Sequence, residues 1–378
     1  MVKLKSIPED FIVTEQFSPK ISASGQHSVF LLEKKDYSTL KAIQLISGAL
    51  GIRPNSISYS GTKDKTAITR QYVSVKCLSE HLRKDFSRKD ISLTYVGQSD
   101  EIISLGSHSG NRFDIVLRDI DKGKGISDLP CKFVNYFDEQ RFSKDNVGIG
   151  LAMLKGDFRM AIQKILSFYS DDTEILEKIN SGHASDISFG DRDDIEAAMV
   201  IVDYLSQKRN DFVGAMKTIP KKILQMYVKS LQSEIFNRSV SEMISKRCDA
   251  FTIEVQRDSS IDSLSVPRDV SGFPVIDINV PIVGFSTRLS DDDISMQIKN
   301  QLEHYGLSQR SFIIRQLPDL SEEGTTRNSV AVAKSISISE QSDDELNTGK
   351  MRQSISFELD PGSYATIFIK HLIRYNSL

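Results

Sequence analysis

Hydrophobic and polar residues alternate over several short stretches of the first 145 residues, and this period of two predicts strands. The predicted strands are rich in apolar and β-branched side chains: Phe11–Thr14, Ser28–Leu32, Ile57–Ser60, Gln71–Lys76 and Phe113–Leu117. A helix is expected from Leu40 to Leu50, where apolar residues recur at helical spacing. Ser38 or Thr39 is a suitable N-cap, and Gly51 lies where this helix should end.

The pattern becomes helical from about Leu151 and returns to strands near the C-terminus. The expected helices are Met160–Phe168, Ile195–Leu205 and Ile223–Ile244, followed by short strands and turns over Asp249–Val283. The expected late elements are strands Phe312–Arg315, Val330–Ile338 and Ile355–Leu359, an exposed loop Ser339–Thr348, and a helix from about Ser363 to Ile373. This order predicts one α/β domain, residues 1–150 and 310–378, with a largely helical insert over 151–309. Two domains in tandem remain the alternative.

Composition places the chain among ordinary soluble globular proteins. Of its 378 residues, 39% are hydrophobic and 26% are charged, and the length allows two domains with sizeable cores. Its apolar runs are too short to span a bilayer, and the N-terminus lacks the apolar stretch of a secretory signal. We therefore expect a cytoplasmic protein, without a membrane partner and monomeric. The net charge is −3, but residues 1–150 carry +4 and the remainder −7, so the N-terminal part is compatible with a phosphate backbone.

Cysteine and histidine spacing argues against a metal site. The three cysteines, Cys77, Cys131 and Cys248, are far apart and form no CxxC pair. The six histidines show no HxH or HxxxH spacing. The sequence also lacks the P-loop, GxGxxG, GxSxG and HExxH motifs. We therefore expect metal-free chemistry.

The densest cluster of charged residues is the segment GTKDKTAITRQ, residues 61–71. Lys63, Lys65 and Arg70 surround Asp64 in a loop between two predicted strands. Nearby positive charge keeps a carboxylate ionised, which is the form that acts as a nucleophile, and the same cations could neutralise phosphates. A charged surface turn explains the composition equally simply, and composition alone favours it.

Two further segments combine polar and aromatic residues. In GNRFDIVLR, residues 110–118, Gly110 and Asn111 are expected to form a turn, and the Asn111 amide suits the polar edge of a base. Phe113 could stack on a base, but strand alternation makes burial in the core at least as good an explanation. In PCKFVNYFDEQRF, residues 130–142, the aromatics interleave with Asn, Gln and Arg, which suits single-stranded RNA, although a packed loop fits nearly as well.

The two ends of the chain carry one short motif each. PEDFIVTE, residues 8–15, is a strand behind a proline-led turn. LDPGSYAT, residues 359–366, runs from a strand through a turn into a helix, with Ser363 as the expected N-cap and Tyr364 beside it. The N-terminus of that helix could hold a phosphate or carboxylate, although a plain strand-to-helix turn is the alternative.

Taken in order, these segments resemble the TruD family of tRNA pseudouridine synthases. The resemblance rests on PEDFIVTE, GTKDKTAITRQ, GNRFDIVLRD, VNYFDEQRF and PGSYAT, with weaker matches at Leu154–Phe158 and Glu234–Arg238. It implies a mixed, largely antiparallel sheet in the catalytic domain and an inserted, largely helical α/β domain. It also implies an enzyme that isomerises a uridine of tRNA, at position 13, without a metal or organic cofactor.

The resemblance also implies roles for individual residues. Asp64 would be the catalytic carboxylate, Phe11 would contact the target nucleotide, Asn111 would bind the uracil or its sugar, and Tyr364 would line the same pocket. Phe113 is a further stacking candidate, and Lys63 and Arg70 are candidates for RNA contact. Asp138 and Ser143 stand where many relatives have glycine, which is a departure because glycine adopts positive φ more readily.

Three functional hypotheses follow. The first is catalysis on a uridine flipped out of its stack, with Asp64 attacking or removing a proton at the sugar or base. The second is a non-catalytic RNA-binding protein, which needs only the basic residues and the aromatics. The third is a protein scaffold acting through the helical middle segment, and it gives the segment 61–71 no task.

Overall fold

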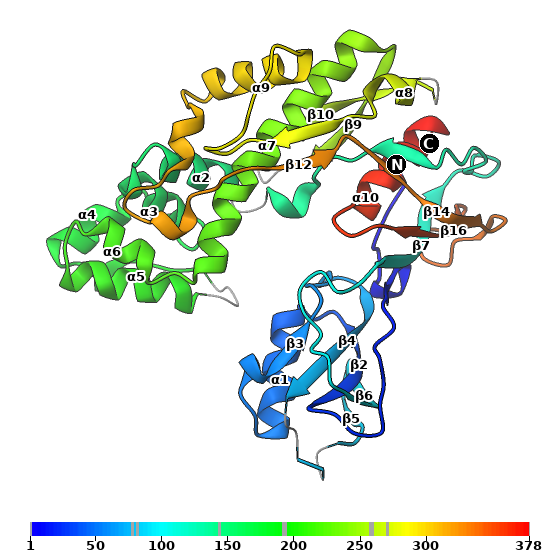
Figure 1. The fold of residues 1–378 in the computed structure, drawn as a ribbon, viewed down its shortest axis with the longest axis horizontal. Helices are drawn as coiled ribbons and strands as arrows, with labels where there is room; N and C mark the ends of the chain where they lie inside the picture. The colour runs from blue at the N-terminus through cyan, green and yellow to red at the C-terminus, as the bar shows by residue number, and fades with distance from the viewer. Residues whose placement is uncertain are drawn as a thin grey trace. The chain divides into compact units, whose positions relative to one another are not determined.

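The computed structural model describes residues 2–76, 79–80, 83–142, 145–190, 195–256, 261–269 and 272–377. They form two compact units (Figure 1): a sheet unit, Met1–Phe133 with Ala331–Leu378, and a helical unit, Val134–Val330. The sequence-based boundaries at 150 and 309 both lie inside the helical unit, the first within α2 (Asn146–Leu154). A change in periodicity marks where helices begin, whereas a unit boundary depends on what packs together. That the helical unit is the family's inserted domain remains a prediction.

The sheet unit is built on one large mixed sheet. Its described strands are β1 (Phe11–Gln16), β2 (His27–Lys35), β3 (Ile57–Tyr59), β4 (Ile68–Lys76), β5 (Phe86–Arg88), β6 (Ile91–Ser99), β7 (Gly110–Ile120), β14 (Lys334–Ile338), β15 (Ser342–Asp343) and β16 (Met351–Leu359). They follow the order β14-β16-β7-β1-β4-β2-β6-β5, with β3 beside β4 and β15 beside β16. Among these described strands only β1 and β4 pair in parallel. The expected mixed, largely antiparallel sheet is therefore confirmed.

The first helix matches its prediction closely. Helix α1 (Thr39–Leu50) begins after Ser38, whose hydroxyl accepts a hydrogen bond from the Lys41 N–H at 3.2 Å. It ends at Gly51, which has a φ of 65°. Its apolar face packs on β2 and β4 (Figure 1), in a core of Phe30, Leu32, Ala42, Ile43, Ile46, Ile57, Val73, Val75, Ile91 and Leu93.

The start of the last helix differs from its prediction. Helix α10 runs over Ala365–Tyr375, and Tyr364, not Ser363, occupies the N-cap position, without a side-chain cap. The Ser363 N–H instead donates to the carbonyl of Asp360 at 3.3 Å, in a turn that contains Gly362 with a φ of 84°. Because Ser363 belongs to this turn and Tyr364 precedes the first helical residue, the prediction that Ser363 caps the helix is wrong.

Strand register decides which side chains share a face of the sheet. Val13 of β1 lies beside Thr69 of β4 and Phe113 of β7, and Phe113 lies beside Phe357 of β16. Neighbouring partners point to the same side, and side chains alternate along each strand. The face that carries Val13 is covered by α1 and α10, and we call it the inner face. Its members from these strands include Phe11, Val13, Glu15, Lys34, Thr69, Gln71, Asn111, Phe113, Phe357 and Leu359.

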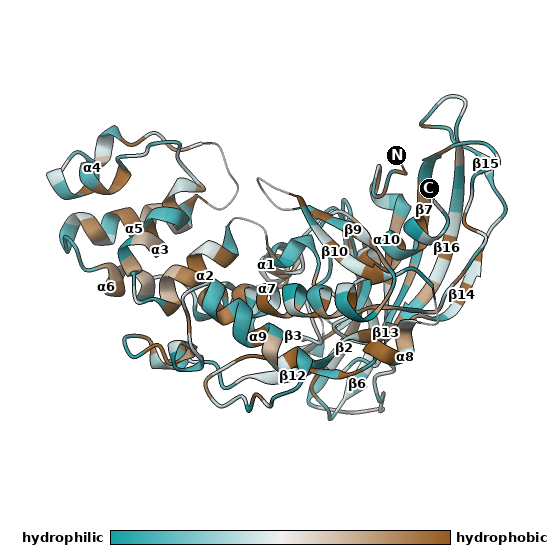
Figure 2. Ribbon diagram, turned by 90° about the horizontal axis from the view of Figure 1, so that it is seen from above, coloured by the Kyte–Doolittle hydropathy of each residue, from teal (hydrophilic) through white to brown (hydrophobic). Residues whose placement is uncertain are grey.

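The helical unit contains α2 (Asn146–Leu154), α3 (Phe158–Ser167), α4 (Ile175–Ser181), α5 (Glu196–Gln207), α6 (Phe212–Lys217), α7 (Lys221–Arg247), α8 (Phe273–Ile276) and α9 (Asp293–His304), with β9 (Ala250–Gln256), β10 (Ile261–Pro267), β11 (Asn279–Ile282) and β12 (Thr325–Asn328). Strands β8 (Lys132–Val134) and β13 (Val330–Val332) carry the unit boundaries. Helices α3, α5 and α9 are amphipathic, and α5 shows both brown and teal residues in Figure 2. Among the described helices, none combines the length and hydrophobicity that crossing a membrane requires.

Two late strands were predicted imperfectly. Residues 312–315 form no strand: Phe312 ends the 3₁₀ helix η7 (Gln309–Phe312), and turn hydrogen bonds follow. Phe312 and Ile314 are both buried, so their spacing imitates a strand. The predicted strand Val330–Ile338 is divided into β13 and β14. Ser335, within β14, has a positive φ of 51°, and a register irregularity follows in its pairing with β16.

Candidate active site

The loop that joins β3 to β4, residues 60–67, lies over a layer of buried polar side chains. The Gln71 amide donates to the carbonyl of Gly61 at 2.9 Å, and the Lys63 N–H donates to the Thr39 hydroxyl at 2.9 Å. The Thr39 hydroxyl in turn lies 3.2 Å from Oε1 of Gln71. These contacts fix the loop backbone on the inner face, because buried backbone groups need partners.

Asp64 occupies the middle of this loop, and its backbone and carboxylate have different partners. Its carbonyl accepts a hydrogen bond of 2.6 Å from Nζ of Lys34, a fully buried side chain on β2. Burial lowers the pKa of Lys34 to about 8; the negative charge of Asp64 opposes the shift, and the positive charge of Lys63 adds to it. The Asp64 carboxylate is 30% exposed and lies 3.1 Å from Nζ of Lys5. The loop therefore holds an ion-paired carboxylate that solvent can reach.

Lys5 joins the loop to the first strand. Its Nζ atom also lies 4.0 Å from the centre of the Phe11 ring, which is the geometry of a cation–π contact. No pattern in the sequence marks this lysine, because it precedes the first motif and belongs to no strand. Its backbone has a φ of 55°, which is unusual for a residue other than glycine. Asp64 and Phe11, predicted to share a site, are thus connected through a residue that sequence reasoning missed.

Lys63 has a structural partner inside the protein. Its side chain is 5% exposed and lies 2.7 Å from the fully buried carboxylate of Glu15. Glu15 also accepts hydrogen bonds from the Ser60 hydroxyl and, at 3.1 Å, from the Tyr72 N–H. In this conformation the charge of Lys63 is directed inward, so the predicted contact with RNA remains a proposal without support from its position.

Arg70 lies on the other face of the sheet. Its neighbour in β1 is Thr14, which alternates with the inner residues Val13 and Glu15. The guanidinium Nε lies 2.5 Å from a carboxylate oxygen of Glu33, and both side chains are more than 40% exposed. The carboxylate of Glu33 is thus the partner of Arg70, and the predicted contact of Arg70 with RNA remains a proposal. The structure does not bring Arg70 together with Phe11.

The two predicted stacking residues are part of an aromatic core. Phe11 is 1% and Phe113 is 7% exposed, and their rings meet edge to face with centroids 6.1 Å apart. Phe113 also stacks on Phe357 at 5.4 Å, and Phe357 contacts Phe368 of α10 at 4.7 Å. Phe113 therefore lies in the core, which is one of the two positions that strand alternation allowed. Phe11 is buried beside it.

Asn111 carries an unpaired polar atom on the inner face. Asn111 and Gly110 begin β7 and do not form the expected turn. A Cβ at Gly110 would lie 2.5 Å from the carbonyl oxygen of Leu359, so only glycine allows this close strand pairing. The Asn111 Oδ1 atom is buried and finds no hydrogen-bond partner among the described residues. Buried polar atoms without partners are uncommon and mark positions where a ligand can supply the missing bond.

Tyr364 is placed by the helix that follows it. It is partly exposed at the N-cap of α10, and α10 packs on the inner face through Phe368 and Phe357. The chain reaches it from Leu359, the β16 neighbour of Asn111. Phe11, Asn111, Phe113 and the loop of Asp64 therefore share one face of the sheet, and Tyr364 begins a helix that covers it.

The aromatic segment 130–142 is a packed loop where it enters the helical unit. Tyr136, Phe137 and Phe142 are at most 6% exposed, and the Tyr136 hydroxyl donates to the Ser265 carbonyl at 2.6 Å. The Asn237 amide makes hydrogen bonds of 2.9 and 2.8 Å with the N–H and carbonyl of Phe137. The packed-loop alternative therefore describes these rings.

The departure at Asp138 has no conformational cost from φ. Asp138 has a φ of −104°, so the position requires no glycine in this structure. Ser143, the second departure, lies outside the described residues, as does Cys77.

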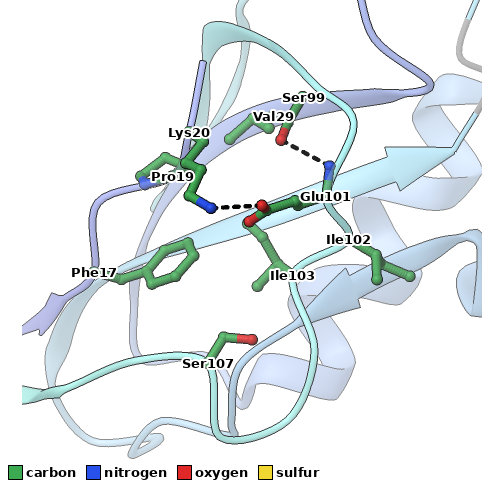
Figure 3. Close-up of a pocket in the computed structure, with 9 residues that line it drawn as sticks. All are labelled: Phe17, Pro19, Lys20, Val29, Ser99, Glu101, Ile102, Ile103 and Ser107. Atoms are coloured by element: carbon green, nitrogen blue, oxygen red, sulfur yellow. Dashed lines mark hydrogen bonds and ion pairs between the residues drawn. The ribbon is translucent and has the colours of Figure 1, made fainter. Parts of the chain in front are cut away.

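A cavity of about 260 Å³ lies elsewhere in the sheet unit (Figure 3). Its walls are Phe17, Pro19, Lys20, Val29, Ser99, Glu101, Ile102, Ile103 and Ser107, with the Lys20 ammonium 2.7 Å from the Glu101 carboxylate. None of the predicted site residues lines it. The segment that forms one wall of the cavity contacts the loop of Asp64, because the Gly106 N–H donates to the Ser60 carbonyl at 2.9 Å.

Several polar residues of the site could have been found from the sequence. Glu15, Lys34 and Gln71 occupy positions in the strand alternation that apolar residues otherwise fill. A polar residue at such a position must be satisfied by a buried partner, and here the partners belong to the loop 60–67. Thr39 was expected only as a possible helix cap, so the sequence indicated its place in the site less clearly.

The chain is similar over almost its whole length to proteins of one known family. The family described as tRNA pseudouridine synthase D (TruD) matches residues 1–372. The chain is 26% identical over 394 residues to the tRNA pseudouridine synthase D of Aquifex aeolicus, covering 98% of each chain. It is 28% identical to a Methanocaldococcus jannaschii protein named probable tRNA pseudouridine synthase D 2, over 98% of this chain and 91% of that one. A crystal structure from Methanosarcina mazei, assigned to TruD, shares the fold with a TM-score of 0.67 at 23% identity, covering 99% and 93% of the two chains.

Proposed function

This chain belongs to the TruD family of tRNA pseudouridine synthases, and we propose that Asp64 is the carboxylate with which it isomerises one specific uridine of tRNA, the uridine at position 13. Pseudouridine synthases are isomerases, so the enzyme class follows from the family. The position in the tRNA is part of the proposal and is supported by the resemblance of the motifs. We propose further that it acts as a cytoplasmic monomer without a cofactor.

The observation that carries the proposal is the position of the Asp64 carboxylate. It is held at a fixed loop, ion-paired with Lys5 at 3.1 Å, and remains 30% exposed. Partial exposure leaves the carboxylate oxygen accessible to a substrate, and the ion pair with Lys5 holds it in place. Asp64 thus has both the position and the access that its proposed role requires.

The reaction moves one bond and needs no net change in atoms. The glycosidic C–N bond breaks, the uracil turns, and its C5 bonds to the ribose carbon while C5 loses a proton and the ring nitrogen gains one. Asp64 acts in this sequence either by attack on the sugar or base or by proton removal. A flipped-out uridine is needed because a stacked one exposes neither the glycosidic bond nor C5. The unpaired Oδ1 of Asn111 supports its proposed role as an acceptor for a polar group of the substrate.

Tyr364 differs from Phe11 and Phe113 in exposure, and exposure determines how each ring could contact the base. Tyr364 is partly exposed and is proposed to line the uridine pocket. Phe11 and Phe113 are buried, so contact with the base requires them to form the floor of the pocket through one edge of the ring. Lys63 and Arg70 are bound to Glu15 and Glu33. Contact of the buried Lys63 with RNA requires it to leave Glu15, whereas the Arg70 side chain is 42% exposed beside Glu33.

The decisive test is the substitution Asp64→Asn, assayed for pseudouridine by chemical mapping of tRNA transcripts. We expect the rate to fall by about a thousandfold or more, with tRNA binding largely retained. The matched control is Asp121→Asn, because Asp121 is an exposed aspartate of the same unit whose carboxylate lies 2.6 Å from Lys350. Turnover of D64N near that of D121N would remove Asp64 as catalyst. If the wild-type protein binds tRNA but forms no pseudouridine, the result supports the hypothesis of a non-catalytic RNA-binding protein.

A further inference from the structure

Strand β2 carries a lysine in a row of core residues. Its inner-face positions include Phe30, Leu32 and Lys34, and all three side chains are 0% exposed. Phe30 and Leu32 belong to the core under α1, whereas Lys34 continues the same row toward the loop of Asp64. Lysine is almost never fully buried unless it is paired, so this position needs an explanation.

The partner of Lys34 is a backbone carbonyl and not a carboxylate. Its Nζ lies 2.6 Å from the carbonyl oxygen of Asp64, and this is its only hydrogen-bond acceptor among the described residues. No described carboxylate lies within 4 Å of the ammonium. The charges that act on it from a greater distance are those of Asp64 and Asp36, which attract it, and of Lys63, which repels it. The buried charge is therefore only weakly compensated.

Such an arrangement is a poor way to stabilise the fold. Transfer of an ammonium from water to the interior is costly, and one hydrogen bond to a neutral carbonyl offsets only part of that cost. A methionine of similar length would fill the same space without the cost. Groups that are kept at the expense of stability are concentrated at functional sites.

From this geometry we propose that Lys34 is a positioning residue of the isomerisation, whose ammonium holds the carbonyl of Asp64 and thereby fixes the direction in which the Asp64 carboxylate leaves the loop. The inference rests on the proposed function of Asp64. Lys34 does not touch the substrate in this scheme, because its side chain has no exposed surface. Displacement of a reacting group by about 1 Å can lower a rate by about a hundredfold, so one firm anchor at the catalytic residue has a measurable effect.

The protonation state of Lys34 gives a second readout. Since burial lowers the pKa of Lys34 to about 8, the ammonium is lost as the pH rises through about 8, and its charged hydrogen bond to Asp64 weakens. Stability changes in the opposite direction. Between about pH 8 and the usual lysine value of 10.5, the unfolded chain binds more protons at this site than the folded chain, so this site makes folding more favourable as pH rises. A fall in turnover above pH 8 without a fall in melting temperature therefore points to positioning and not to unfolding.

The groups around Lys34 predict a simple pH profile. Asp64 and its partner Lys5, together with Asp36 and Lys63, are the charged groups that face it from the loop, the N-terminal segment and the end of β2. Lys34, whose pKa burial lowers to about 8, loses its charge as the pH rises through this range.

The test compares Lys34→Met with Lys35→Met under saturating tRNA. Lys35 is the next residue of β2, but it is 38% exposed and pairs with Glu9 at the surface. For K34M we expect a kcat lowered by about ten- to a hundredfold, a Kd for tRNA within about twofold of wild type, and a melting temperature no lower than wild type. K35M should match wild type in all three. Wild type and K35M should lose kcat as the pH rises through about 8, and K34M should lack that step.

Each result has a definite consequence. A K34M enzyme with wild-type kcat and pH profile overturns the proposal. A lowered kcat also overturns it if tRNA binding weakens by the same factor or if the melting temperature falls below that of wild type. Should K34M not fold, the wild-type profile decides alone: a kcat constant from pH 7 to 9.5 overturns the proposal. Failure of the proposed function looks different, because D64N would then remain active or the wild type would form no pseudouridine.

Discussion

The Nζ atom of Lys5 lies 3.1 Å from Oδ2 of Asp64, although the two residues are 59 positions apart in the chain. The same atom lies 4.0 Å from the centre of the Phe11 ring. One ammonium therefore connects the candidate catalytic carboxylate with the aromatic floor of the inner face. The left-handed backbone of Lys5 costs roughly 1–3 kcal/mol and is retained only where the surroundings hold it.

We predict that Lys5→Met lowers turnover strongly and stability little. The pair is about a quarter exposed, and such pairs contribute about 1 kcal/mol or less to folding. Loss of the cation leaves the Asp64 carboxylate unpaired and free to turn, so we expect kcat to fall by about tenfold or more. The matched control is Lys3→Met, because Lys3 pairs with Asp119 in a more exposed position of the same segment. Equal kcat for K5M and K3M would contradict the assigned role.

We predict that Lys63→Met destabilises the sheet unit and affects RNA binding only indirectly. The Lys63–Glu15 pair is buried, and removal of one partner leaves an uncompensated buried charge, which costs about 3–5 kcal/mol. The double variant Lys63→Met with Glu15→Gln should be less destabilised than the sum of the single changes. Urea unfolding measures all three variants. A K63M protein of wild-type stability with weaker tRNA binding would instead show that Lys63 faces RNA.

Asn111→Leu should separate function from stability. Oδ1 of Asn111 has no hydrogen-bond partner among the described residues, so its replacement removes a buried unpaired atom and leaves the unfolding free energy unchanged or higher. If Oδ1 accepts a hydrogen bond from the substrate, kcat/KM falls by about tenfold. A variant that loses stability but keeps kcat/KM would show that Asn111 is structural.

Acid should weaken the sheet unit through the cluster around Arg118. This buried guanidinium lies 2.8 Å from Asp10 and from Asp344. Burial raises the pKa of Asp344, but hydrogen bonds from the Asp119 N–H, Asn347 and Arg118 outweigh it and hold the pKa well below 3.8. A carboxyl with a lowered folded pKa contributes stability above its unfolded value and loses it as pH falls below about 4.

The experiment for this cluster is urea unfolding at pH 7 and at pH 3. The wild type should lose more unfolding free energy between the two than Asp344→Asn, which lacks the titrating group. D344N itself should be less stable than wild type at pH 7, because Arg118 loses a buried anionic partner. An equal loss for both proteins between pH 7 and pH 3 would show that other carboxylates govern the acid sensitivity.

The sequence determined the elements whose signals are local. Ser38 and Gly51 marked the ends of α1 because capping depends on residues next to the helix, and alternation marked β1, β2, β4 and β7 because a strand exposes every second side chain. Ordered motifs from both ends of the chain indicated the family, and the family match over residues 1–372 confirmed it. Ser363 and the segment Phe312–Arg315 show the limit: local propensity there was outweighed by a turn and by separate burial of two residues.

The tertiary structure decided what each charged side chain does. Lys63, Asp64 and Arg70 stand within eight residues, yet one is buried against Glu15, one meets Lys5, and one lies on the opposite face beside Glu33. Alternation shows which residues of one strand share a face, but the face that becomes covered depends on the register of strands distant in the chain. Ion pairs form between whatever groups folding brings together. The positions of charges in the sequence therefore indicated a site, and only the packing of the sheet determined which of them can serve it.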